Sequence, residues 1–149
     1  MQNKAKAAID RIERECIALR VRMLNRMVTN VYDEALRPLR LKASQLNVLV
    51  AVAKLGVAQP TRLCEILQLD VSTLSRNLDR MRAKGWIEVV PGEDNRAQPV
   101  RLAAPGWKLV DKAVPAWEEA QQQVSSLLGQ EGVALLTRTS RKMATQTSR

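Results

Sequence analysis

The sequence contains no histidine, the side chain most often used as a general base near neutral pH. Its two cysteines, Cys16 and Cys64, are too few for a disulfide framework, and without histidine they do not complete a zinc site. A glycine-rich phosphate-binding loop is also absent. We therefore predict that the chain is not an enzyme, and we expect neither a metal nor a cofactor.

Long apolar runs are missing too, since none approaches the roughly 20 residues that a membrane-spanning helix needs. The first residues, MQNKAKAAIDRIERE, are charged throughout and lack the apolar segment of a secretory signal. A length of 149 residues is enough for one domain with a hydrophobic core. These features predict a single domain over residues 1–149, a cytoplasmic location and no association with a membrane.

Positive charge is in excess, with 24 basic and 15 acidic side chains and a net charge of +9. Such a balance is typical of proteins that bind polyanions. Residues 1–56 hold 11 basic and 5 acidic side chains, whereas residues 57–106 hold 7 and 6. Because the middle of the chain is nearly neutral, binding of DNA there depends on where a few individual cations are placed.

Apolar residues at helical spacing predict long helices at both ends of the chain. A helix over residues 5–36 is about 45 Å long, which exceeds the width of a small domain. Near the other end, Pro105 begins a helix with heptad spacing that Pro115 is expected to bend and Gly129 to end. An intramolecular core accounts for only part of these lengths. We therefore predict that residues 5–36 and 104–146 pair two copies of the chain. In the first of these helices, the apolar residues at helical spacing form one stripe, which consists of Ile9, Ile12, Cys16, Leu19, Met23, Met27 and Val31.

Residues 43–103, between these helices, follow the order helix, helix, helix, strand, turn, strand. The third helix, from Val71 to the glycine stop at Gly85, buries one apolar face and presents a polar one. Strands are expected at Trp86–Val90 and Pro99–Leu102, joined by a charged turn. The pattern predicts a mainly α fold with a small β-hairpin wing, that is, a winged helix-turn-helix.

Two segments carry a resemblance to a known family. STLSRNLDRMRAKGWI, Ser72–Ile87, and EDNRAQPVRLAAPG, Glu93–Gly106, are similar to the recognition helix, wing and following helix start of the MarR (multiple antibiotic resistance regulator) family. The resemblance covers nearly the whole chain. It implies a transcriptional regulator that binds double-stranded DNA sequence-specifically. It also implies a homodimeric repressor on a palindromic operator, released by a small, aromatic and anionic effector.

Two residues depart from the family pattern at positions where helices begin. Lys42 precedes the second predicted helix, and Ala103 follows the second strand, where the family usually has threonine in both places. Threonine is a good N-cap, whereas neither replacement offers a side-chain acceptor. We therefore expect each of these two caps to be weakened by about 1 kcal/mol.

The polar face of the helix after Asp70 is the first part of the predicted DNA site. Short polar or basic residues suit the N-terminal end of a recognition helix, which enters the major groove. Arg76 suits a guanine edge or a phosphate, and the residues at the sides suit the backbone. On its own, such a face is more often merely solvated. The predicted contacts are Ser72, Thr73, Ser75, Arg76, Asn77 and Arg80.

The wing turn is the second part of the predicted DNA site. Arg96 is suited to a narrow minor groove, where negative potential is concentrated. Asp94, close to it in the turn, is suited to hold the guanidinium by a charge-assisted hydrogen bond. A polar helix followed at this spacing by a charged wing turn indicates a DNA-binding site more specifically than either feature does alone.

Arg26 and Cys16 are the candidates for regulation. Arg26 intrudes on the first apolar stripe, where it is either an anion-binding residue for an effector or, as we favour, part of an ion pair at the dimer interface. Cys16 lies early in the first helix, as the reactive cysteine does in a peroxide-sensing branch of the resembled family. Packing is the favoured interpretation for Cys16, which leaves redox sensing as an alternative. A winged-helix protein-interaction module is the alternative from another functional class.

Overall fold

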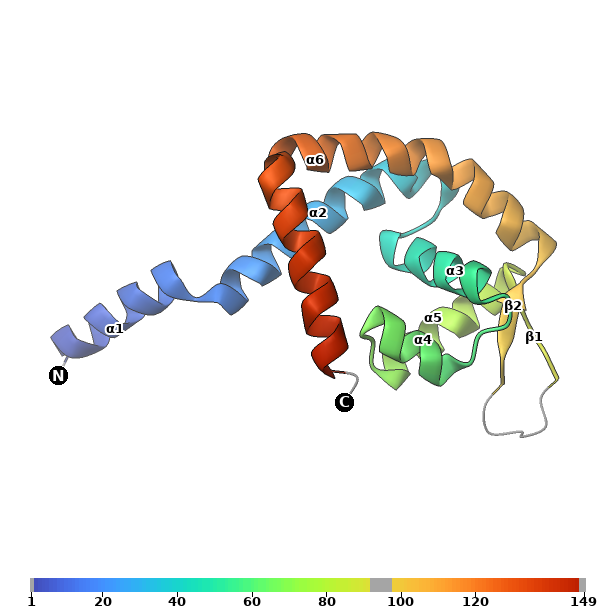
Figure 1. Cartoon of the computed structure of the whole chain (residues 1–149), viewed down its shortest axis with the longest axis horizontal. Coiled ribbons are helices and arrows are strands. Elements are labelled where there is room, and N and C mark those ends of the chain that lie inside the picture. Colours follow the sequence, from blue (N-terminus) through green and yellow to red (C-terminus); the bar gives the residue numbers. More distant parts are fainter. Residues whose placement is uncertain (1, 92–97, 148–149) are drawn as a thin grey trace.

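The computed structural model describes residues 2–91 and 98–147, with side chains over 4–91 and 98–146. The fold is mainly helical, with a β-hairpin wing and long terminal helices, as the sequence predicts (Figure 1). The elements are α1 (Gln2–Glu15), α2 (Ile17–Leu36), a short 3-10 helix η1 (Arg37–Leu39), α3 (Ala43–Leu55), α4 (Pro60–Leu67), α5 (Val71–Ala83), β1 (Ile87–Val89), β2 (Val100–Leu102) and α6 (Ala104–Thr147). No helix in the described ranges is long and apolar enough to cross a membrane.

Helices α3, α4 and α5 and the two strands form what we call the winged-helix lobe, residues 43–103. Its strands are antiparallel, with Ile87 opposite Leu102 and Val89 opposite Val100. Ala58, in the connection between α3 and α4, exchanges two backbone hydrogen bonds with Val100, at 2.8 and 2.9 Å. The base of the wing is thereby fixed to the helices. The buried core beneath includes Val48, Leu49, Val52, Leu63, Leu74, Met81 and Ile87.

The first part of α6 begins directly against the wing. The backbone N–H of Ala103 donates to the carbonyl of Trp86 at 3.0 Å. A Cβ added to Gly106 would lie 2.1 Å from that same carbonyl oxygen, so only glycine permits this close approach. From there α6 runs along α2, and together they form the second layer of the molecule (Figure 1).

The predicted single helix over residues 5–36 is wrong, because the chain leaves helical geometry at Cys16 (φ −67°, ψ 105°). The Cys16 Sγ accepts a hydrogen bond from the N–H of Leu19 at 3.4 Å and so caps α2. Arg20 donates to the carbonyls of Glu13 and Arg14, at 3.1 and 3.5 Å, and so binds the end of α1. The apolar stripe continues through both helices, and its spacing therefore does not reveal the break.

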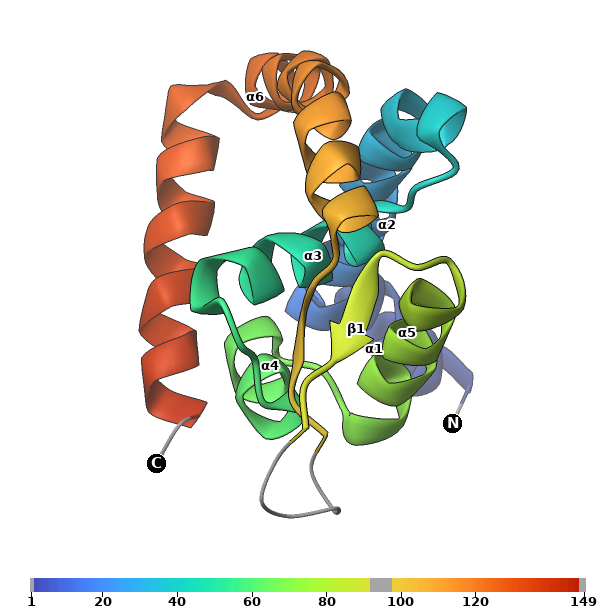
Figure 2. The same ribbon diagram turned by 90° about the vertical axis from the view of Figure 1, so that its right-hand side faces the viewer.

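The predicted break at Gly129 is confirmed. This residue has φ 69° and ψ 168°, a conformation that glycine adopts readily and other residues rarely do. Beyond it the helix resumes, and its second part turns sharply away from the first and descends beside the winged-helix lobe (Figures 1 and 2). Pro115 lies inside the first part without ending it.

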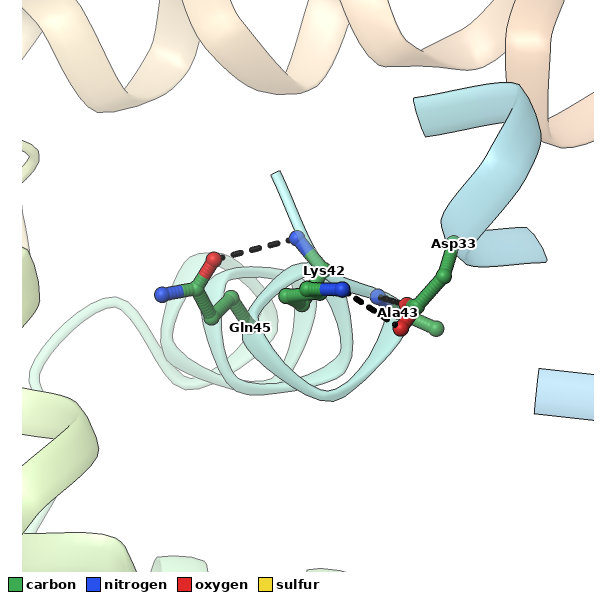
Figure 3. A network of polar contacts seen from close by, with 4 residues as sticks. All are labelled: Asp33, Lys42, Ala43 and Gln45. Atoms are coloured by element: carbon green, nitrogen blue, oxygen red, sulfur yellow. Dashed lines mark hydrogen bonds and ion pairs between the residues drawn. The ribbon is translucent and has the colours of Figure 1, made fainter. Parts of the chain in front are cut away.

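The cap of α3 at Lys42 is not weakened as predicted. Asp33, from α2, accepts the N–H of Ala43 through Oδ1 at 2.8 Å, and its Oδ2 lies 3.2 Å from Lys42 Nζ (Figure 3). Gln45 Oε1 accepts the N–H of Lys42 at 3.0 Å. Two N–H groups at the start of α3 are thus satisfied, one of them by a residue of another helix. At Ala103 the weakened cap stays a prediction, because alanine has no side-chain acceptor.

Candidate nucleic-acid interface

The start of α5 is organised around Asp70, its N-cap. Asp70 Oδ1 accepts the N–H of Thr73 at 2.8 Å and the hydroxyl of Ser72 at 2.6 Å, while Oδ2 accepts the hydroxyl of Thr73 at 2.7 Å. The Ser72 hydroxyl, followed by the hydroxyl and N–H of Thr73, holds the pKa of Asp70 well below its usual range. The carboxylate therefore stays charged and orders the first turn of the helix.

Two of the predicted DNA-contacting residues, Ser72 and Thr73, make hydrogen bonds within the chain in this arrangement. The hydroxyl protons of Ser72 and Thr73 are both directed to Asp70. A hydroxyl that donates to a carboxylate presents its oxygen lone pairs to other partners. In this state both residues stabilise the first turn of α5, and donating to a phosphate would require them to exchange partners.

The remaining predicted residues of α5 lie on different sides of the helix. Arg76 and Arg80 are exposed, and Arg76 Nε donates to the carbonyl of Ser72, one turn earlier, at 3.3 Å. Asn77 is half-buried. Ser75 lines a cleft of about 390 Å³ between α4, α5 and the wing strands. The structure thus brings Ser72, Thr73 and Arg76 together at the start of the helix, and it places Ser75 beside the wing.

The wing carries a basic residue that the sequence reasoning missed. Arg101 on β2 lies opposite Glu88 on β1, and their side chains pair at 2.6 Å on the surface. Alternation along the second strand places Arg101 outward, which was a signal available in the sequence. The predicted wing residues Asp94 and Arg96 lie outside the described residues.

The candidates for regulation lie elsewhere. Arg26 is exposed on α2. Cys16 is half-buried at the junction of α1 and α2, while Cys64 lines the cleft beside α5, and both are free thiols. In the described part of the chain, no three histidine, cysteine, aspartate or glutamate side chains lie close enough to hold a metal ion.

Comparison with known proteins places this geometry in a family. A model described as "MarR family" matches residues 41–97, which include α3, α4, α5 and β1 of the winged-helix lobe. The structure of a mutant E. coli MarR complexed with operator DNA superposes with a TM-score of 0.78 at 27% identity, over 89% of this chain and 96% of that one. M. tuberculosis transcriptional regulator MOSR in complex with DNA gives a TM-score of 0.77 at 30% identity, over 91% of this chain and 99% of that one.

The chain belongs to the MarR family. The multiple antibiotic resistance protein MarR of Salmonella typhimurium is 35% identical to it over 85 residues, which are 56% of this chain. This chain spans 59% of the length of that relative. Members of the MarR family are transcription regulators rather than enzymes, in agreement with the prediction made from the absent catalytic groups.

Two cavities of this MarR-family chain lie where the winged-helix lobe meets the long helices. One of about 500 Å³ lies between α3, α4 and α6, and the other, of about 280 Å³, lies between α2, α3 and α6. Trp117 and Asn47 line both cavities. Tyr32 lines the smaller one, donates its hydroxyl to Gln121 Oε1, and has a pKa raised by burial.

Asp70→Ala is expected to lower the melting temperature at pH 7, because it removes the acceptor of three hydrogen bonds. The pKa of Asp70 is lower in the folded than in the unfolded chain. Its stabilisation is therefore fully present above about pH 5, and it declines as the pH falls below the unfolded value of about 3.9. The melting-temperature difference between wild type and variant, followed by circular dichroism, should shrink between pH 7 and pH 2.5.

The control for this measurement is Asp70→Asn, which keeps an N-cap acceptor but has no carboxylate to titrate. Its melting temperature at pH 7 should be higher than that of Asp70→Ala. The difference in melting temperature between these two variants should change little as the pH falls. A wild-type advantage over Asp70→Ala that is as large at pH 2.5 as at pH 7 contradicts the assignment.

Proposed function

We propose that this chain is a sequence-specific regulator of transcription that binds double-stranded DNA through α5 and the wing. The observation that carries the proposal is the exposed, pre-ordered first turn of α5, held by Asp70 beside a β-hairpin (Figure 2). Arg76 and Arg80 supply exposed cations on this helix, and Arg101 supplies one on the wing. Two relatives of similar fold, MarR and MOSR, have structures in complex with DNA, which supports the proposal.

The proposed active form is a homodimer that binds a palindromic operator as a repressor. Helix α1 extends away from the rest of the chain (Figure 1), and its Ile9 and Ile12 are 63% and 61% exposed. In α6, Leu127 and Leu135 are 75% and 54% exposed. Apolar stripes of this extent favour burial against a partner. Two-fold pairing of these helices presents two α5 helices to half-sites about one helical turn apart.

We also propose that a small, aromatic and anionic effector releases the DNA by binding beside Trp117. The cavity of about 500 Å³ is lined mainly by apolar side chains, and Lys54 supplies a cation in its wall. A ring that stacks among apolar groups and a carboxylate that pairs with Lys54 match this lining. Arg26 is not among the residues that line this cavity, which leaves its proposed role to the dimer interface.

Arg76→Ala is expected to weaken operator binding about tenfold and to reduce the preference for operator over unrelated DNA, since a cation at a base edge contributes about 1–3 kcal/mol. Arg96→Ala should weaken binding to both DNAs to a similar extent, as the loss of a minor-groove cation does. The measurement is titration of an operator, selected from genomic fragments and footprinted, at fixed salt. Wild-type affinity should fall steeply as salt is raised.

The matched control for these variants is Arg138→Ala, which removes the same charge from the second part of α6. It should bind operator like wild type. The assignment of the DNA site is refuted by unchanged affinity in both Arg76→Ala and Arg96→Ala. A chain that protects no short palindrome supports the protein-interaction alternative instead.

Sedimentation velocity at micromolar concentration should show a dimer for the wild type. Ile12→Glu places a charge in the exposed apolar stripe of α1 and should shift the equilibrium towards monomer, because an unpaired charge is costly in an apolar interface. Arg14→Glu, on the opposite face of the same helix, serves as the control and should remain dimeric. A monomeric wild type would refute the proposed pairing.

Benzoate, as a probe for aromatic anions, should quench tryptophan fluorescence and lower operator affinity at millimolar concentration. Trp117→Ala and Lys54→Ala should each weaken the response about tenfold, the value of one lost charged or stacked contact. Trp107→Ala, which removes a tryptophan outside both cavities, is the control and should respond like wild type. A full response in both cavity variants excludes this site.

A further inference from the structure

Asp33 connects the long helices to the winged-helix lobe. It belongs to α2, yet its carboxylate accepts the N–H of Ala43, the first residue of α3, at 2.8 Å and pairs with Lys42 Nζ at 3.2 Å. Gln45 completes the start of α3 by accepting the N–H of Lys42 at 3.0 Å (Figure 3). We call these four residues the Asp33 clamp.

The two contacts of Asp33 differ in strength. The Ala43 N–H lies at a helix N-terminus, where a carboxylate both satisfies a donor and meets the positive end of the helix dipole. The Asp33 side chain is 23% exposed, whereas that of Lys42 is 66% exposed. Ion pairs with an exposed member contribute little. The hydrogen bond to Ala43 is therefore the part of the clamp that fixes geometry.

Helix α3 is the element through which α2 acts on the rest of the lobe. It packs against α2 and α6, and it also packs against α4 and β2 of the lobe. Helix α4 in turn packs against α5. A rotation of α3 about the α2 contact therefore carries α5 and the wing with it.

The covalent connection between α2 and α3 is short. It consists of η1 and residues 40–42, in which Arg40 has a left-handed backbone (φ 52°) and Leu41 is buried. The Asp33 clamp bridges the two ends of this connection, because it joins Asp33 in α2 to the first turn of α3. It thereby adds a direct contact between α2 and α3 beside the covalent connection, and this contact limits the angle between the two helices.

We propose that Asp33 is a positioning residue for operator recognition, which fixes the angle of the winged-helix lobe on the dimerisation helices and so sets the spacing between half-sites. This inference rests on the proposed function. In a dimer, the distance between two α5 helices must match one helical turn of DNA, about 34 Å. Without the clamp each lobe keeps its own core and still binds a half-site. The distance between the two lobes of the dimer, however, varies over a wider range.

The first test measures tolerance of spacing. Binding is measured on the selected operator and on versions with one base pair inserted or deleted between half-sites. Wild type is expected to bind the operators of altered spacing at least about fivefold more weakly than the selected operator. A change of about fivefold in affinity is at the low end of typical coupling between two sites. Asp33→Ala is expected to lose less than about twofold on the same change.

Three further variants separate the contacts. Asp33→Asn keeps an acceptor for the Ala43 N–H and should restore the wild-type spacing penalty. Lys42→Ala removes only the exposed ion pair and should also behave like wild type. Glu34→Ala is the matched control, since it removes a neighbouring carboxylate of α2 whose partner, Arg37 at 2.7 Å, lies outside the lobe.

The second test needs no DNA. Spin labels at Arg82→Cys on α5 and Gln122→Cys on α6, with Cys16→Ser and Cys64→Ser, report the distance within one chain when labelled protein is diluted into unlabelled protein. The distance distribution should broaden in Asp33→Ala and stay narrow in Asp33→Asn and Glu34→Ala.

The two tests distinguish failure of the clamp from failure of the proposed function. If no operator is selected, the proposed function fails and the distance distribution decides the clamp on its own. An unchanged distance distribution, or a wild-type spacing penalty, in Asp33→Ala overturns the inference. Should Asp33→Ala fail to fold, Asp33→Ser, which is too short to reach Ala43, takes its place with the same expectations.

Discussion

The carbonyl oxygen of Trp86 is the point on which the junction between the wing and α6 depends. It accepts the N–H of Ala103 at 3.0 Å, and it occupies the space that a side chain at Gly106 would need. One backbone group therefore fixes both the end of the wing and the direction in which α6 leaves the lobe. At the other junction of the lobe, where the chain enters it, the side chain of Asp33 accepts a backbone N–H in the same way and joins α2 to α3. The lobe is held at its entrance and at its exit, each time by an oxygen acceptor on a backbone N–H.

Much of this fold follows from the sequence. Apolar spacing located the long helices, Gly129 marked the turn in α6, and Asp70 marked the start of α5, because periodicity and capping act over a few neighbouring residues. The break at Cys16 does not follow, because the apolar stripe is continuous across it. The cap from Asp33 does not follow either, since it lies nine residues before Lys42 and on another helix, where sequence spacing carries no signal.

The candidate site was predictable in part for the same reason. Helical geometry alone placed Arg76 and Arg80 on the exposed face of α5. It did not show that the hydroxyls of Ser72 and Thr73 serve Asp70, because each hydroxyl has several acceptors within reach of a helix start. Nor did it place Ser75 in the cleft beside the wing, which depends on how α4 and the strands pack against α5.

The hydroxyl pair at Asp70 has a thermodynamic consequence. A binding surface that is ordered beforehand pays little conformational entropy when its partner arrives. With two side chains and a backbone N–H already directed to one carboxylate, the first turn of α5 has lost that freedom during folding. In the proposed association with DNA through this turn, the entropic cost is therefore smaller than for a segment that folds on contact, and the remaining terms are desolvation and exchange of hydrogen-bond partners.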